Sequence, residues 1–246
     1  MQNHSPRLGN LLLFIAILAV LIVATMMFGA QFDLWEPIVG FALIRQYMNP
    51  IAYFVITIGV LGLVHQILTG NRFGALKSCI TCLLGITLLA PFIYQQIQPP
   101  VRFPPIHDIT TDTVNPPDFL VIDEDRAGAR NSLVYGGSEI ALQQFKHYPD
   151  IGPIQSELSA TQAYSKALQV AANMEWEMVA QDDDNLRFEA SARTRLYRFI
   201  DDVVVVVTPE GHSSRVDIRS VSRIGRGDRG VNAMRIRAFI DAFNKS

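Results

Sequence analysis

The stretch that decides the architecture runs from Leu11 to Ala30, reads LLLFIAILAVLIVATMMFGA and contains no charged residue. Two more apolar stretches follow: Ile51 to Leu68 is uncharged, and Ala75 to Tyr94 has Lys77 as its single charge. Roughly 20 apolar residues in a helix cross the hydrocarbon core of a bilayer. Because backbone amides must be paired inside lipid, each stretch predicts a membrane-spanning helix.

The rest of the chain is polar and predicts a separate domain. A transmembrane region over residues 1–98 precedes a domain over residues 99–246, and a proline-rich stalk, Gln95 to Pro105, joins them. A cleaved signal peptide is disfavoured, because only Arg7 precedes the first stretch and Ala24 to Ala30 is a poor cleavage site. The sequence therefore predicts an integral membrane protein that keeps its first helix and contacts the lipid bilayer.

The charges near the spans predict an orientation. Arg7 and Arg72 flank the spans on one side, whereas the loop between the first two spans carries Asp33 and Glu36 against one arginine, Arg45. Because Lys and Arg favour the cytoplasmic side of short loops, the polar domain is expected on the opposite side. In a bacterium this means an inner-membrane protein with a periplasmic C-terminal domain.

The two cysteines of the chain, Cys79 and Cys82, both lie in the third span. Their spacing allows a thiol–disulfide site on one helix face, with the first thiol near a helix start that favours thiolate. We favour two small residues that pack between helices, because the polar domain contains no cysteine with which to exchange.

The polar domain has patterns typical of an α+β fold. Ser159 to Met174 predicts a helix, with Ser159 and Gln162 as a capping box, and Val231 to Phe243 predicts another. Four strands are expected between them, at 176–179, 186–191, 203–207 and 215–223. The segment 107–117 reads as an ordered loop or an edge strand. This order predicts an antiparallel sheet with helices on one face, behind the N-terminal three-helix transmembrane region.

Acidic residues also gather at Asp182 to Asp184, followed by Asn185. They lack the alternating ligands and the later bidentate glutamate of a calcium loop. A hairpin turn is the better interpretation, and the sequence predicts neither a metal site nor a cofactor.

Charge is divided unevenly along the polar domain. Residues 101–184 contain five Lys or Arg against fourteen Asp or Glu, whereas residues 185–246 contain twelve against seven. The two halves can pair with each other across the fold, or the arginines can form a site for an anion, since guanidinium groups match carboxylate and phosphate oxygens. Nucleic acid is not an expected partner, because the overall balance is not basic.

A glycine-rich stretch lies near the end of the chain and reads, from Arg219 to Arg235, RSVSRIGRGDRGVNAMR. Gly225, Gly227 and Gly230 lead into the last predicted helix, whose free N–H groups suit an anion. The alternative is a plain connection in which Asp228 or Asn232 caps the helix. Under that alternative, the strand arginines Arg219 and Arg223 pair with Asp201 and Asp202. The glycine spacing is not that of a dinucleotide-binding loop.

Three motifs in order, HDITTDTVNPP from His107, FIDDVVVVV from Phe199 and RSVSRIGRGDRGVNAMRIRAF from Arg219, resemble the DUF1499 family of unknown function. The resemblance covers roughly Pro104 to Phe243 and implies no particular reaction. It adds weight to a set of candidate ligand-binding residues: Asp108, Asp112, Asp201, Asp202, Arg219, Ser220, Ser222, Arg223, Gly225, Asp228, Gly230 and Asn232.

Three functions compete. The favoured one is a membrane-anchored envelope protein that binds an anionic small molecule, lipid or cell-envelope component. The second is a structural partner of another membrane protein, indicated by small residues in the spans such as Gly59, Gly62 and Gly85. The last is a hydrolase-type enzyme that uses the aspartates with His107 or His212, although no nucleophile elbow or metal motif supports it.

Overall fold

The computed structural model describes residues 7–98 and 101–245, so Pro99 and Pro100 of the predicted stalk lie outside the described residues. The chain forms two compact units. The first consists of the residues up to Val101 together with Leu196–Arg198, and the second consists of Arg102–Arg195 and Phe199–Ser246.

The first unit is a bundle of three long helices, α1 (Arg7–Phe28), α2 (Pro37–Leu68) and α3 (Arg72–Ile97), with a short 3-10 turn, η1 (Gly29–Phe32), after α1. All three are long and apolar enough to cross a membrane. α2 extends well before its apolar stretch because Pro37 occupies the first turn, where its fixed φ suits a helix start. At the start of α3, the side chain of Asn71 accepts a hydrogen bond of 2.9 Å from the amide of Gly74.

Small residues let these helices approach closely. A Cβ at Gly59 would lie 2.7 Å from Sγ of Cys82, and one at Gly85 would lie 2.9 Å from the amide nitrogen of Ile56. A Cβ at Gly62 would overlap Leu12. These glycines thus permit contacts between helices of the same chain. Cys82 is one of the small residues at the interface between α2 and α3.

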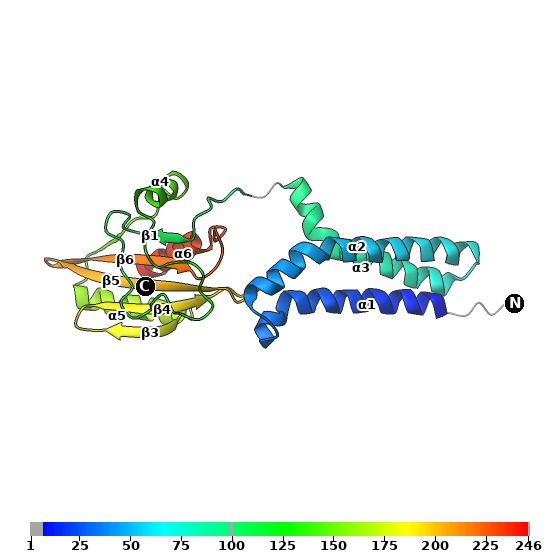
Figure 1. Cartoon of the computed structure of the whole chain (residues 1–246), viewed down its shortest axis with the longest axis horizontal. Helices are drawn as coiled ribbons and strands as arrows, with labels where there is room; N and C mark the ends of the chain where they lie inside the picture. The colour runs from blue at the N-terminus through cyan, green and yellow to red at the C-terminus, as the bar shows by residue number, and fades with distance from the viewer. Residues whose placement is uncertain (1–6, 99–100, 246) are drawn as a thin grey trace. The chain divides into compact units, whose positions relative to one another are not determined.

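The second unit is built on one antiparallel sheet (Figure 1). Its strands follow the order β1-β6-β5-β4-β3. The short strands β1 and β2 pair with different parts of β6, β1 with residues 219–221 and β2 with residues 214–216. Three helices accompany them, so the α+β class and the three apolar N-terminal helices are confirmed. The bounds are β1 (Asp108–Thr110), α4 (Gly137–His147), β2 (Ile154–Ser156), α5 (Ala160–Asn173), β3 (Glu177–Asp182), β4 (Arg187–Arg193), β5 (Ile200–Glu210), β6 (Ser213–Ser222) and α6 (Val231–Lys245).

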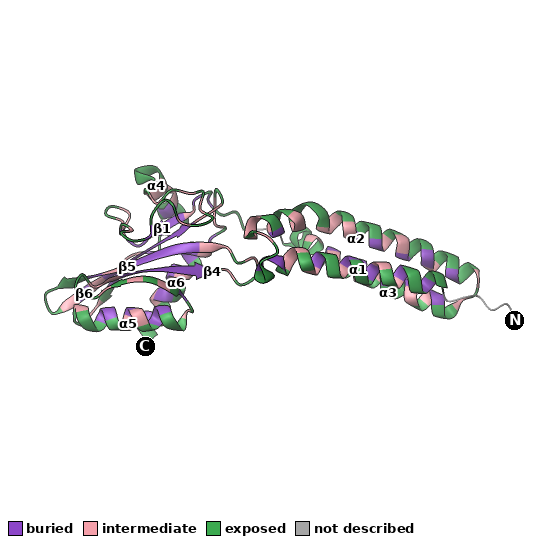
Figure 2. Ribbon diagram, turned by 60° about the horizontal axis from the view of Figure 1, so that its bottom comes forward, coloured by how far each residue is buried: buried purple, intermediate pink, exposed green. Residues whose placement is uncertain are grey.

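One face of the sheet is apolar and is covered by α5 and α6. Alternate residues of the central strand, Val203, Val205 and Val207, point into this core, and β5 is buried along most of its length in Figure 2. Trp176 stacks on Phe239 of α6, with ring centroids 5.3 Å apart. Alternation on β5 therefore leaves the even-numbered positions, including Asp202, for the opposite face.

Two elements have no counterpart among the sequence predictions. α4 was missed because it has no apolar stripe, and its single buried residue is polar: Gln144 donates to the carbonyl of Thr110 (2.6 Å) and accepts from the amide of Thr110 (3.0 Å). β2 was missed because it has only three residues. The segment 107–117 contains β1 on the sheet edge, and the turn at Asp182–Asn185 closes the β3–β4 hairpin.

Candidate functional site

The second face of the sheet is polar, and a long irregular segment, residues 111–135, lies over it. We call this segment the cover loop. Charged side chains of β4, β5 and β6 point toward it, and most are buried. Their partners include many backbone groups of the cover loop, so this face is held by hydrogen bonds and ion pairs.

Arg219 of β6 is the centre of this face and is fully buried. Its guanidinium group donates to both carboxylate oxygens of Asp108, at 3.0 and 2.7 Å. It also donates to the carbonyls of Pro117 (3.1 Å) and Leu133 (2.6 Å), which lie near the two ends of the cover loop. The expected pairing of Arg219 with Asp201 or Asp202 is therefore wrong: its partner is an aspartate 111 positions earlier in the chain.

Two aromatic rings complete the surroundings of Arg219. The guanidinium carbon lies 5.5 Å from the ring centroid of Phe119 and 5.4 Å from that of Tyr135. Burial, with the nearby Asp108 carboxylate, raises the pKa of Tyr135 to about 12. Such a fully enclosed guanidinium group holds the loop in place and is closed to ligands from solvent.

A second buried carboxylate, Asp202 of β5, joins two arginines. Arg223 donates to it at 2.7 Å and Arg126 of the cover loop at 2.8 Å. Arg223 also donates to the carbonyl of Ala127, and Ser191 donates to Asp202 at 3.0 Å. The expected pair of Arg223 with Asp202 is confirmed, and this pair too fastens the cover loop.

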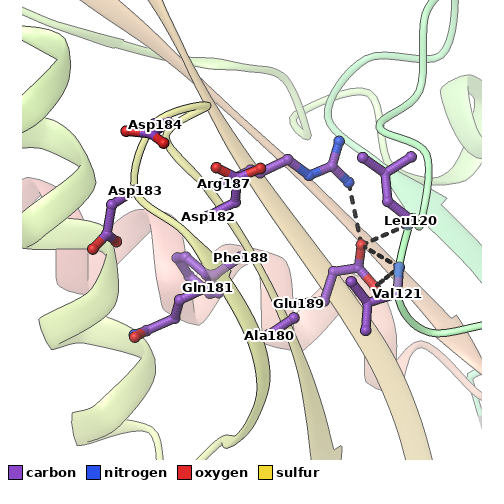
Figure 3. Close-up of a pocket in the computed structure, with 10 residues that line it drawn as sticks. All are labelled: Leu120, Val121, Ala180, Gln181, Asp182, Asp183, Asp184, Arg187, Phe188 and Glu189. Atoms are coloured by element: carbon purple, nitrogen blue, oxygen red, sulfur yellow. Dashed lines mark hydrogen bonds and ion pairs between the residues drawn. The ribbon is translucent and has the colours of Figure 1, made fainter.

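Glu189 of β4 is a residue that sequence reasoning missed. Its side chain is almost completely buried and accepts from three consecutive amides. The distances are 2.6 Å from Leu120 and 3.2 Å from Val121, both drawn in Figure 3, and 2.7 Å from Ile122. Arg187 lies 3.3 Å away. Strand alternation places Glu189 on the face opposite Phe188, but no sequence pattern predicts a carboxylate that binds backbone amides 67 to 69 positions away.

Asp112 lies at the rim of this face with Arg215 and Asp217. Arg215 donates to Asp112 at 2.6 Å and to Asp217 at 2.7 Å. Burial works against ionisation of Asp112, but the amides of Asn115 and Val114 and the Arg215 guanidinium together lower its pKa. Asp112 also lines a surface pocket of about 290 Å³, whereas Asp108 and Asp202 are buried away from solvent.

The helix-covered side of the sheet holds a fourth polar cluster around Asn232 of α6, which is fully buried. Asn232 accepts from the hydroxyl of Ser220 (2.8 Å) and donates to the hydroxyl of Ser222 (2.9 Å). Arg235 links the same region to Asp201 at 2.5 Å. Because Asp201 and Asp202 are adjacent in a strand, their side chains point to opposite faces of the sheet.

The glycine-rich loop, residues 223–230, ends in a helix cap. The carboxylate of Asp228 accepts from the amides of Gly230 (2.9 Å) and Asn232 (2.6 Å) at the start of α6. Burial raises the pKa of Asp228, and the Asp201 carboxylate adds to the shift. The N-terminal end of α6 is therefore capped by a carboxylate of its own chain, as the capping alternative predicts. Gly230 has a φ of +80° and lies against the ring of Phe103.

Eleven of the twelve predicted residues thus belong to four polar clusters and one helix cap, and the twelfth, Gly225, lies in the glycine-rich loop, where its carbonyl accepts from the side chain of Asn131. Binding of a ligand by them stays a prediction, since every charged member has a partner inside the fold. Within residues 7–98 and 101–245, no group of three His, Cys, Asp or Glu side chains is arranged to hold a metal ion. Among the arginines with exposed side chains, Arg102 precedes β1, and Arg226 and Arg229 belong to the glycine-rich loop.

Comparison with known proteins gives a family match. Residues 108–243 match the model of a family described as protein of unknown function (DUF1499), which covers more than half of the chain. A search of curated proteins finds no match.

Proposed function

The chain belongs to the DUF1499 family, whose description assigns no function, and we propose from its geometry that the polar domain binds anionic lipid headgroups. In this account the three apolar helices anchor the chain in the bilayer. The exposed arginines near the stalk then bind the surface of the same membrane.

The observation that carries the proposal is the attachment of the glycine-rich loop to the first residues of the domain. The amide of Asp228 donates to the carbonyl of Ile106 at 3.2 Å. A Cβ at Gly227 would lie 3.1 Å from the Cα of Pro105, so the two segments are in close contact. Because α3 ends at Ile97, at most about 30 Å of extended chain connects it to Ile106. The glycine-rich loop is therefore attached to the residues that follow the last candidate span in the chain.

The exposed side chains around this attachment have the composition of a membrane-surface site. Arg102 and Arg226 are exposed, and the described part of the chain offers neither of them an ion-pair partner. Val101 and Phe103 flank Arg102 and are exposed as well. Basic residues near an anionic leaflet contribute about 1 kcal/mol each, and neighbouring apolar groups add burial in the interface.

The end of α4 extends this surface. Gly230 lies between the ring of Phe103 and the hydroxyl of Tyr148, so the residues after α4 meet the glycine-rich loop. Phe145, 72% exposed, and Lys146 lie on the outward side of the same helix end. We call Arg102, Phe103, Phe145, Lys146 and Arg226 the basic surface.

The proposal moves ligand contact away from the buried arginines. Arg219 and Arg223 each hold the cover loop, so their role in this account is to keep the domain folded. The positions of Arg7 and Arg72 support a periplasmic location in a bacterial inner membrane, where the ligand is an anionic phospholipid.

Native mass spectrometry of the full chain in detergent tests the proposal. Phosphatidylglycerol is expected to remain bound at lower lipid concentration than phosphatidylcholine. Arg102→Gln combined with Arg226→Gln should remove this preference and leave the fold unchanged, because both side chains are exposed.

The matched control is Arg193→Gln, an exposed arginine of β4 that pairs with Glu177. This variant should retain the preference for phosphatidylglycerol. Equal retention of both lipids by the wild-type chain, or equal loss in Arg193→Gln, would contradict the proposal.

A further inference from the structure

A groove of about 540 Å³ lies between the cover loop and the β3–β4 hairpin. Leu120 and Val121 form one wall, and Ala180–Asp182 of β3 form the other (Figure 3). Asp183 and Asp184 of the hairpin turn line the acidic end of the groove. This place is independent of the basic surface and plays no part in the proposed lipid binding.

One wall of the groove is a free strand edge. β3 is the last strand of the sheet, and over the described residues its pairing is with β4 alone. The register is irregular between Met178 and Ala180 and then regular from Ala180 to Asp182. The regular part lines the groove together with its partners on β4, Arg187–Glu189. The N–H and C=O groups of β3 on the side away from β4 are available to another strand beside the groove.

The opposite wall presents aliphatic side chains on a fixed backbone. Leu120 and Val121 are 68% and 59% exposed, although their amides are bound to the buried carboxylate of Glu189. Exposed aliphatic groups beside a groove are typical of a protein-binding surface. Because Glu189 fixes the backbone, these side chains are held in place before any partner arrives, which lowers the entropy cost of binding.

The charge of the groove selects the partner. Asp182 is engaged in its own turn with Asn185, and Asp183 accepts from the hydroxyl of Tyr164. Asp184 is exposed, and within the residues that the structure describes it has no ion pair. Arg187 also lines the groove, but it forms an ion pair of 3.3 Å with Glu189, so the three aspartates leave the groove acidic. An acidic groove attracts a cationic side chain and disfavours an acidic one.

We propose that this groove binds an extended, basic segment of a partner protein, which adds as a strand to the outer edge of β3. An aliphatic side chain of the partner contacts Leu120 and Val121, and a Lys or Arg side chain lies beside Asp184. Strand addition supplies affinity through main-chain hydrogen bonds, and the side-chain contacts supply selectivity.

The test uses the full chain in phosphatidylcholine nanodiscs, which do not attract basic peptides, and a fluorescein-labelled peptide of sequence VKVRVK. Its residues alternate between aliphatic and basic side chains, as a strand beside an acidic edge requires. Fluorescence anisotropy should rise saturably with protein concentration, and the acidic peptide VEVDVE should not bind. Hydrogen exchange of the amides of Ala180–Asp182 should slow when VKVRVK is bound, because a new strand covers that edge.

Two variants and one control separate the groove from general charge attraction. Leu120→Ser removes the aliphatic contact without a change of charge, and Asp184→Lys reverses one charge; each should weaken VKVRVK binding at least about tenfold. Val134→Ser alters another exposed aliphatic residue of the cover loop, outside the groove, and should bind like the wild type. Circular dichroism checks that each variant is folded.

The proposal is overturned if VKVRVK gives no saturable signal, if VEVDVE binds equally well, or if Leu120→Ser and Asp184→Lys bind like Val134→Ser. Lipid preference in the mass spectrometry experiment is unaffected by any of these results, so the two proposals fail separately.

Discussion

The two faces of the sheet are covered in different ways. The face under α5 and α6 buries aliphatic and aromatic side chains, such as Val205 and Phe239, which need only volume and shape. The face under the cover loop buries Arg219, Asp202 and Glu189, which need particular donors and acceptors. Apolar packing tolerates exchange among residues of similar size, whereas a satisfied polar network specifies one loop backbone. The polar face therefore determines the shape of a surface loop.

Among the substitutions that test this comparison, Asp108→Ala should have the largest effect on stability. It leaves the buried guanidinium of Arg219 without its carboxylate, and we expect a loss of about 3–5 kcal/mol of unfolding free energy. Urea unfolding of the full chain, followed by Trp176 fluorescence in a Trp35→Phe background, measures the loss. Phe239→Ala on the apolar face should cost a similar amount, about 3–5 kcal/mol, through a cavity.

A double substitution then distinguishes the faces. Asp108→Leu combined with Arg219→Met removes both charges, and we expect it to recover most of the stability lost in Asp108→Ala. The carbonyls of Pro117 and Leu133 lose their donor, so the cover loop should still exchange its amides faster than in the wild type. Unchanged exchange in the double variant would show that Arg219 does not hold the loop.

Glu189→Gln gives a smaller effect. The amide side chain offers one acceptor oxygen to three backbone donors, so we expect about 1–3 kcal/mol of destabilisation and faster hydrogen exchange at Leu120–Ile122. The matched control is Glu177→Gln on β3, whose exposed side chain pairs with Arg193 and should change stability by less than about 1 kcal/mol. Equal exchange in the two variants would argue against the role assigned to Glu189.

The smallest effect concerns the pH dependence of the α6 cap. Burial raises the pKa of Asp228 above its ordinary value of 3.8, so the folded state keeps this proton when the unfolded state has lost it. The wild type should therefore lose stability relative to Asp228→Asn as the pH rises from 3.8 through the raised pKa, and the difference should then stay constant. Urea unfolding of both proteins from about pH 3 to about pH 7 measures this difference. A difference that grows in favour of the wild type over this range would contradict the assigned shift.

Much of the fold could be predicted from the sequence because hydrophobic patterns report it directly. The three spans are recognisable as uncharged stretches, Val203 to Val207 indicate a central strand, and Ser159 with Gln162 indicates a helix start, which the structure confirms as a capping box. These signals are local: each depends on residues that are neighbours in the chain.

The arrangement of the polar residues could not be predicted in the same way. Their types were recognised, but Arg219 pairs with Asp108 across 111 positions, and Glu189 binds backbone amides that carry no sequence signature. α4 could not be predicted because its buried residue, Gln144, is polar and leaves no apolar pattern in the sequence. Arg102 and Arg226 lie in segments that the sequence analysis singled out, the stalk and the glycine-rich stretch. Only the structure, through the hydrogen bond from Asp228 to Ile106, shows that these two segments are in contact.

The most direct test of the account asks whether the glycine-rich loop lies at the membrane surface. A bimane label at Met234→Cys, an exposed position in the first turn of α6, reports on the loop in a Cys79→Ala, Cys82→Ala background. In nanodiscs with lipids that carry a headgroup quencher, we predict strong quenching when phosphatidylglycerol is present and weak quenching with Arg102→Gln plus Arg226→Gln. Equal quenching in both proteins, or none in either, would contradict the claim that these arginines bind the lipid surface.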